Sequence, residues 1–125
     1  MILLTKNQIL LLHEQLINHY GGTHGIRDEA LLNSAISAPG QTFDGKDLYP
    51  TVQDKAVRLC YGLIQNHPFY DGNKRIGALA LLITLDLNHI TLTATNTELT
   101  DIILSVASSR ASVQDMLVWV LDHSQ

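Results

Sequence analysis

The stretch HPFYDGNKRIGALALLITLDL, residues 67–87, decides the fold of this chain. Its first part is polar, and from Ile76 onward it becomes a largely apolar run that ends at Asp86. A helix that is apolar on nearly every face is buried in the middle of a bundle, since a surface helix keeps one polar face. The stretch therefore predicts a central buried helix from about Asn73 to Leu87, entered through a polar loop.

Apolar residues recur at helical spacing on both sides of this stretch. Ser, Thr and Asp side chains cap helix starts, because they accept hydrogen bonds from the free N–H groups of the first turn. Such residues precede expected helices at Thr5, Asp28, Thr51 and Ser112. The first helix is expected over about Lys6–Tyr20, the second through Ala38, and the fifth from near Asn96. Together these elements predict an all-α fold, a compact bundle of about six helices around the central helix.

The segment PGQTFDGKDLYP, residues 39–50, separates the second and third expected helices. It is rich in turn-forming residues, which indicates a surface loop or a small hairpin. Residues 40–46, GQTFDGK, match the spacing of a P-loop, but Asp47 follows where Ser or Thr would hold Mg²⁺. A P-loop also follows a buried strand, whereas a helix precedes this segment, so a short hairpin is the better interpretation.

Length and composition indicate one domain, residues 1–125, with a modest single core. The formal net charge of −4 is unlike the basic charge of nucleic-acid binders, so no direct nucleic-acid partner is expected. Cys60 is the single cysteine, so nothing indicates an oxidising compartment, and we expect its side chain in the core. No apolar run is long enough to span a bilayer, and no signal peptide is recognisable. The expectation is a soluble, cytoplasmic protein that does not associate with a membrane.

Gly72, Asn73, Lys74 and Arg75 stand where the central helix begins. A helix start carries unpaired N–H groups and partial positive charge, so after a glycine turn it forms a cradle for anions. The two basic side chains add fixed positive charge, and the amide side chain adds a further hydrogen-bonding group. These four residues predict a phosphate-binding site.

His67 and Asp71 stand at the entrance of this expected site. A neutral imidazole near a phosphate can take the proton of an incoming hydroxyl group. A carboxylate near a polyphosphate commonly holds Mg²⁺, because carboxylate and phosphate otherwise repel each other. The set predicts nucleotide-dependent group transfer, with His67 as catalytic base and Asp71 as metal ligand. The structural alternative is a plain helix entry with Asp71 as its cap.

The motif HPFYDGNKR, residues 67–75, resembles the signature His-x-Phe-x-Asp/Glu-Gly-Asn-x-Arg of the Fic/Doc (Fido) family. The resemblance extends to APGQTFDGKDLYPTVQDKA, residues 38–56, which is similar to the loop and following helix of the family's death-on-curing branch. It implies a single Fido domain, a small helical bundle in which the motif loop leads into the central helix. For this branch it also implies a toxin controlled by a separate antitoxin, whose disordered tail folds on binding.

Two positions favour that branch. Fic adenylyltransferases of this family carry Gly at the position of Lys74 and a second Arg at the position of Ala78. The resemblance therefore implies a protein kinase that uses ATP with Mg²⁺. It would transfer the γ-phosphoryl group to a Thr or Ser hydroxyl of a translation factor, by resemblance elongation factor Tu, and so inhibit translation.

The family's site residues carry over by position. His67 matches the catalytic base and Asp71 matches the Mg²⁺ ligand. The groups that match the phosphate-binding residues are Gly72, Asn73, Lys74 and Arg75. The hairpin segment matches a flap that pairs with the target and holds its hydroxyl near the base, since strand pairing recognises backbone groups. Its expected target-binding residues are Gln41, Thr42, Phe43, Asp44, Gly45 and Lys46.

Two other functions remain open. The first is a Fic-type adenylyl or nucleotidyl transferase of the same fold, and the second is a catalytically silent Fido binding module. Self-inhibiting relatives carry Ser/Thr-x-x-x-Glu, which is absent here. The remaining histidines show no metal-ligand spacing, and most are expected at the surface or as caps. They are His13, His19, His24, His89 and His123.

Overall fold

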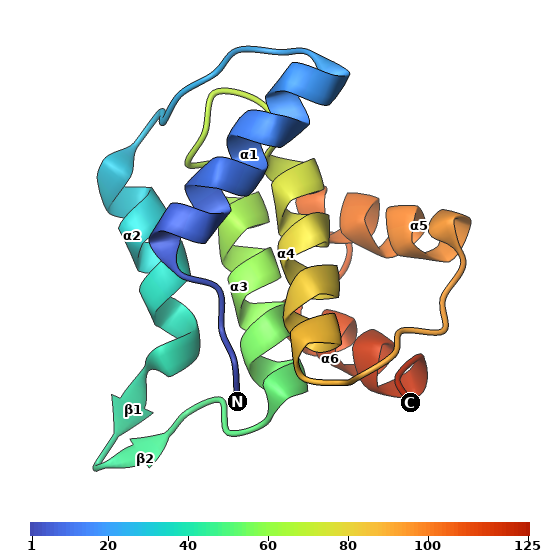
Figure 1. The fold of residues 1–125 in the computed structure, drawn as a ribbon. Coiled ribbons are helices and arrows are strands. Elements are labelled where there is room, and N and C mark those ends of the chain that lie inside the picture. The colour runs from blue at the N-terminus through green and yellow to red at the C-terminus, as the bar shows by residue number, and fades with distance from the viewer.

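The structure, a computed structural model that describes residues 1–125, is a bundle of six α-helices with one small hairpin (Figure 1). The helices are α1 (Lys6–Tyr20), α2 (Glu29–Ser37), α3 (Val52–Asn66), α4 (Asn73–Leu87), α5 (Asn96–Ala107) and α6 (Val113–Asp122). Between α2 and α3 lie a short 3₁₀ turn, η1 (Ala38–Gly40), and the antiparallel strands β1 (Thr42–Phe43) and β2 (Lys46–Asp47). The predicted all-α fold with a short hairpin is confirmed.

The predicted caps determine where the helices begin. The side chains of Thr5, Thr51 and Ser112 each accept a hydrogen bond from the N–H three residues later. In each case the residue at that third position bonds back to the cap, which completes a capping box. Asp28 caps α2 in the simpler way, through the N–H of Leu31. The 3₁₀ turn takes up Ala38, so α2 ends one residue earlier than predicted.

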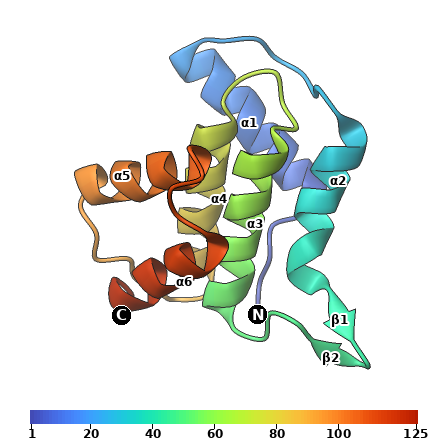
Figure 2. The same cartoon turned by 180° about the vertical axis from the view of Figure 1, so that it is seen from behind.

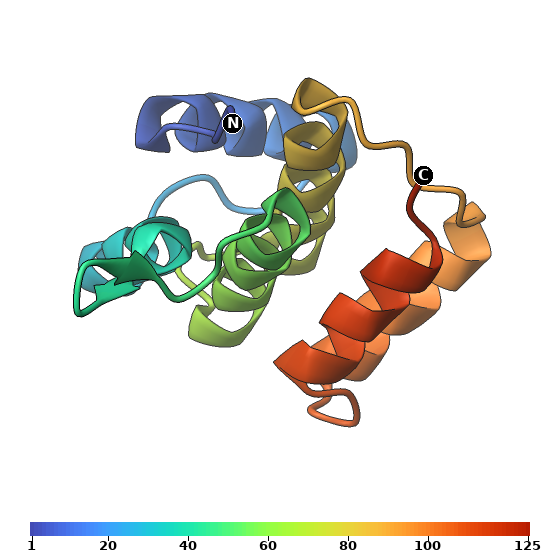
Figure 3. The ribbon, with the colours of Figure 1, turned by 90° about the horizontal axis from the view of Figure 1, so that it is seen from below.

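Two helices, not one, occupy the centre. Figure 3 shows α3 and α4 side by side in the middle, with α1 and α2 on one side and α5 and α6 on the other. The buried side chains form one cluster around Leu63 and Ile76, shared with α1 and α2, and a second around Cys60 and Leu81, shared with α5 and α6. Figure 2 shows the same order from behind. The predicted burial of the helix after the polar loop is confirmed, and α3 joins it at the centre.

Gly77 allows the two central helices to approach closely. A Cβ atom at this position would lie 2.9 Å from Cγ1 of Ile64 and 3.2 Å from the carbonyl oxygen of Cys60. The Cys60 side chain is fully buried there, and burial raises the pKa of its thiol. Cys60 is therefore a core residue, as expected.

The C-terminal part of the chain packs through a narrow buried stripe. On α6 this stripe consists of Met116 and Val120, whereas 51% of the surface of Leu121 is exposed. The segment ITLTAT, residues 90–95, is extended but forms no strand of a sheet. It pairs with the C-terminus through a single bridge between Leu92 and Ser124. No helix has the length and apolar character needed to cross a membrane.

We predict that Gly77→Ala lowers the free energy of unfolding by about 1–3 kcal/mol, because the added methyl group overpacks the contact between α3 and α4. Urea unfolding measures the change. Gly40→Ala is the matched control, since nothing lies within 4 Å of its added Cβ atom. We expect the control to change stability by less than about 0.5 kcal/mol. Equal effects of the two substitutions would contradict the close approach.

Candidate functional site

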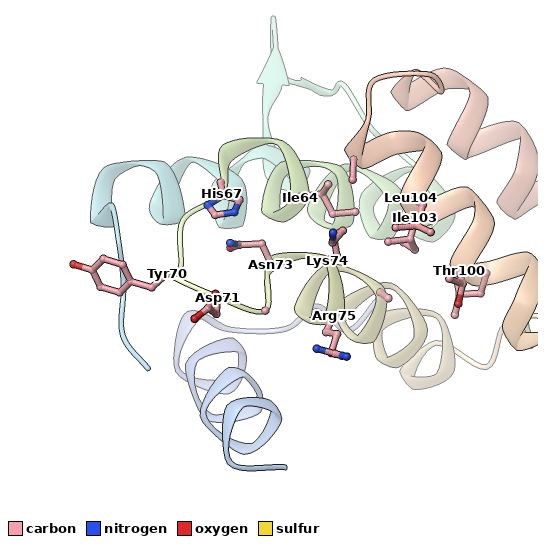
Figure 4. Close-up of a pocket in the computed structure, with 14 residues that line it drawn as sticks. Ile64, His67, Tyr70, Asp71, Asn73, Lys74, Arg75, Thr100, Ile103 and Leu104 are labelled. Atoms are coloured by element: carbon pink, nitrogen blue, oxygen red, sulfur yellow. The ribbon is translucent and has the colours of Figure 1, made fainter. Parts of the chain in front are cut away.

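The end of α3, the loop after it, the start of α4 and one face of α5 enclose a cavity of about 720 Å³ (Figure 4). All six residues that the sequence predicts for the loop side line this cavity: His67, Asp71, Gly72, Asn73, Lys74 and Arg75. The opposite wall comes from α5, chiefly Leu99, Thr100, Ile103 and Leu104. Sequence reasoning missed this wall, because its residues carry only the ordinary apolar spacing of a packed helix. The cavity is thus polar and cationic at one end and apolar at the other.

The start of α4 has the properties of an anion site. Gly72 has φ +79° and caps the helix without any side-chain hydrogen bond. The backbone N–H groups of Asn73, Lys74 and Arg75 make no hydrogen bond within the chain. Unpaired N–H groups at a helix start attract negative charge, and the loop glycine lets a phosphate approach the backbone closely.

The two cations take different directions from the first turn of α4. In Figure 4, Lys74 points to the side of the turn on which His67 and Ile64 lie, whereas Arg75 points away from His67. The guanidinium group of Arg75 lies 4.4 Å from the ring centre of Tyr20 at the end of α1. Neither cation forms a salt bridge within the chain. Their charge is therefore available to an anionic ligand in the cavity.

The side chain of Asn73 holds the loop closed instead of facing a ligand. It is only 4% exposed. Its Oδ1 accepts a hydrogen bond from the N–H of Phe69, and its Nδ2 donates one to the carbonyl of Phe69, both at 3.0 Å. Both hydrogen bonds lie within the loop, so the amide has a structural role, and its expected contact with a phosphate stays a prediction. What Asn73 presents at the cavity is its backbone N–H.

Asp71 is oriented by the linker between α1 and α2. Its Oδ2 accepts a hydrogen bond of 2.6 Å from the N–H of Thr23, and its carbonyl accepts one of 2.8 Å from Nε2 of His13. Oδ1 makes no hydrogen bond within the chain, so one carboxylate oxygen is free. No group of three or more His, Cys, Asp or Glu side chains lies close enough to hold a metal ion without a substrate. A single carboxylate fits Mg²⁺, which commonly takes one or two carboxylates, substrate phosphates and water.

His13 is buried behind the motif loop, although most of the histidines outside the motif were expected at the surface or as caps. It is 3% exposed, and its ring stacks on Phe69 with centroids 3.7 Å apart. Because a carbonyl only accepts, the hydrogen bond to Asp71 requires the proton on Nε2. Burial lowers the pKa of His13, which keeps the ring neutral near pH 7. Its spacing within α1 is that of an ordinary core residue, so only its polar contact distinguishes it.

The hairpin does not lie at the cavity. Figures 1 and 2 show β1 and β2 beyond the N-terminal end of α3, whereas the loop with His67 follows the C-terminal end. None of the six expected flap residues lines the cavity. The hairpin is held at its position by buried Lys55, which donates to the carbonyl of Pro39 at 3.0 Å and pairs with Asp47 at 3.4 Å. Its role in target binding stays a prediction, and by itself it does not place a hydroxyl beside His67.

Gln65, near the end of α3, has a structural role. Its Nε2 donates a hydrogen bond of 2.6 Å to the carbonyl of Val106, which joins α3 to α5. The side chain therefore fixes the wall opposite the motif loop instead of lining the cavity.

Comparison with known proteins agrees with the motif. Residues 3–85 match the model of the Fic/DOC family. A curated relative, Toxin Doc from Mycolicibacterium smegmatis, is 40% identical over 75 residues. That match covers 60% of this chain and 58% of the relative. The matched family region contains the loop and α4 as far as residue 85, and α5 lies after it.

We predict that Asn73→Ala lowers the free energy of unfolding by about 2–4 kcal/mol, because it leaves the buried N–H and carbonyl of Phe69 without partners. Thermal and urea unfolding measure the loss. Asn18→Ala, an exposed position on α1, is the control and should stay within about 0.5 kcal/mol of the wild type. An Asn73 variant as stable as this control would show that the paired hydrogen bonds contribute nothing.

The lowered pKa of His13 gives a second prediction. Above its ordinary value of 6.5 the ring is neutral in both the folded and the unfolded chain. Below that value the unfolded chain gains a proton that the folded chain resists, so stability falls as the pH falls. We expect wild-type stability to decrease more between pH 7.5 and 5.5 than that of His13→Gln, which keeps an N–H donor but does not titrate. Urea unfolding at both pH values tests this, and parallel losses in the two proteins would refute it.

Proposed function

The chain belongs to the Fic/DOC family, and we propose that it is a death-on-curing-type toxin that phosphorylates a protein of translation. It would use ATP as donor and a Ser or Thr hydroxyl as acceptor. One observation carries the proposal: Lys74 lies without a salt-bridge partner at the unpaired N-terminus of α4, on the same side as His67. A phosphate bound there is next to an imidazole that can accept a proton.

In the proposed reaction His67 removes the proton of the target hydroxyl. The hydroxyl oxygen then forms a bond to the γ-phosphorus of ATP, the bond between that phosphorus and the bridging oxygen of ADP breaks, and ADP leaves. The N–H groups of α4 and the charge of Lys74 and Arg75 oppose the negative charge of the transferring group. Atoms and charge balance without any further co-reactant.

Asp71 is the residue that would hold Mg²⁺, through the carboxylate oxygen that Thr23 leaves free. Bound to the phosphate oxygens, the ion would lower their negative charge and help to orient them. The hydrogen bonds from Thr23 and His13 fix the direction of Asp71 before any nucleotide binds.

The choice of the γ-phosphoryl group rests on Lys74 and Ala78. Both residues line the cavity. A lysine at the anion site occupies space that a phosphate chain would otherwise use, and alanine on the next turn offers no second clamp for the outer phosphates. Nucleotidyl transfer by the same residues is the second candidate, favoured by the apolar α5 wall, which suits the base or sugar of a nucleotide.

The biological setting of the proposal comes from the family resemblance of the motif. The toxin would be paired with an antitoxin whose tail folds on binding, and both would act in the cytoplasm. The proposed target is a translation factor, elongation factor Tu by family resemblance. The relative named Toxin Doc supports this setting.

We predict that the chain with Mg²⁺ transfers label from γ-labelled ATP, but not from α-labelled ATP, to elongation factor Tu or to another protein in a translation-factor fraction. His67→Ala should lower the rate by at least about 100-fold, because it removes the base. His89→Asn, an exposed substitution with positive φ at the far end of α4, is the control and should transfer at the normal rate. Chelation of Mg²⁺ should abolish transfer.

The other outcomes separate the alternatives. Label from the α position would show nucleotidyl transfer and would overturn the kinase assignment. No label from either position, together with no measurable binding of Mg²⁺ and ATP, would identify a catalytically silent module. Full activity in His67→Ala would overturn the role of this histidine.

A further inference from the structure

We propose that Arg27, in the linker between α1 and α2, is the positioning residue that sets the conformation of His67. Its Nε donates a hydrogen bond of 2.7 Å to the carbonyl of His67, and its Nη2 donates one of 3.0 Å to the carbonyl of Asn66. Its backbone N–H donates a third, of 2.7 Å, to the carbonyl of Pro68. Three consecutive carbonyls around the proposed base are therefore held by one residue distant in sequence. The proposal rests on the proposed function only where it calls His67 the base.

The C-terminal end of α3 needs such a partner. A helix that ends in a left-handed residue normally binds its last carbonyls with the N–H groups of the residues that follow. Here the residue after His67 is Pro68, which has no N–H. No N–H of the following residues bonds to the last turn of α3. The guanidinium group of Arg27 supplies the missing donors, and its positive charge lies at the negative end of the helix dipole.

The conformation of His67 is one that the chain does not favour locally. Its φ is 50° and its ψ is 53°, in the left-handed region that glycine occupies without strain. A residue before proline is further biased toward extended conformations. Such a residue keeps its conformation only when its surroundings over-determine it. The bidentate contact of Arg27 provides that constraint, and it directs the imidazole from the end of α3 toward the cavity.

Arg27 has no other contact that would explain its position. It is an exposed residue, and it forms no salt bridge. All its side-chain hydrogen bonds go to the two carbonyls at the end of α3. The flat fork of a guanidinium group fits two neighbouring carbonyls, whereas a lysine ammonium group reaches them as a single point.

The test compares Arg27→Gln and Arg27→Lys with the wild type and with Arg110→Gln. Arg110 is an exposed arginine in the turn before α6, and its side chain bonds only to the Ser108 hydroxyl. We expect Arg27→Gln to lower kcat for γ-phosphoryl transfer by about 100-fold, as for a displaced catalytic group, with an unchanged KM for ATP. The kcat of Arg27→Lys should lie between those of Arg27→Gln and the wild type. The kcat of Arg110→Gln should equal that of the wild type. In a further variant, Arg27→Ala, added guanidinium ion at millimolar concentration should partly restore the rate of γ-phosphoryl transfer.

A second measurement does not depend on the enzymatic assignment. NMR of the labelled imidazole of His67 should show an altered chemical shift in Arg27→Gln and Arg27→Lys but not in Arg110→Gln, with all melting temperatures recorded. An unchanged His67 signal in a folded Arg27 variant would overturn the proposal, even if the wild type transferred no label. A raised KM with normal kcat would also overturn it, because Arg27 would then bind the nucleotide. A shifted His67 signal in an inactive wild type would leave the positioning role intact and count against the proposed function.

Discussion

The paired hydrogen bonds between Asn73 and the backbone of Phe69 are the interaction on which the site depends. They close the loop between the two central helices, so that the end of α3 and the start of α4 face the same cavity. A buried N–H and a buried carbonyl need partners, and a single amide side chain satisfies both. The backbone N–H of the same residue is unpaired because it lies in the first turn of α4, so Asn73 both closes the loop and contributes a free N–H to the start of the helix.

The loop is held on its other side by the chain between the end of α1 and the start of α2. Ile26 pairs with Phe69 in an isolated antiparallel bridge, and the N–H of Tyr70 donates to the carbonyl of Gly25. With the contacts of His13, Thr23 and Arg27, every residue from 67 to 71 has a partner in residues 13–28. A catalytic group must be held in position within a fraction of an ångström. A loop in a small domain is held that rigidly only when a second segment of the chain pairs with it along its length.

Local signals made most of the fold predictable. Capping residues placed the helix starts, and the apolar run after the motif identified a buried helix, because both depend on neighbours a few residues away. The six site residues predicted from the motif all line one cavity. The missed features, His13, Arg27 and the α5 wall, depend on contacts between residues more than twenty positions apart, which spacing does not encode. Asn73 shows the converse limit, since a polar residue in a binding motif was assigned to the ligand and its hydrogen bonds to the backbone were not foreseen.

The two halves of the cavity obey different constraints. The cationic half lies in the part of the chain that matches the family, and its geometry follows from helix ends and paired loops. The apolar half comes from α5, which lies beyond that match and is joined to α3 through Gln65. A helix wall of Leu, Ile and Ala side chains can change its shape by substitution without disturbing any buried hydrogen bond, whereas the loop cannot. Buried hydrogen bonds therefore restrict substitution on the loop side of the cavity, whereas the α5 face can change its shape more freely.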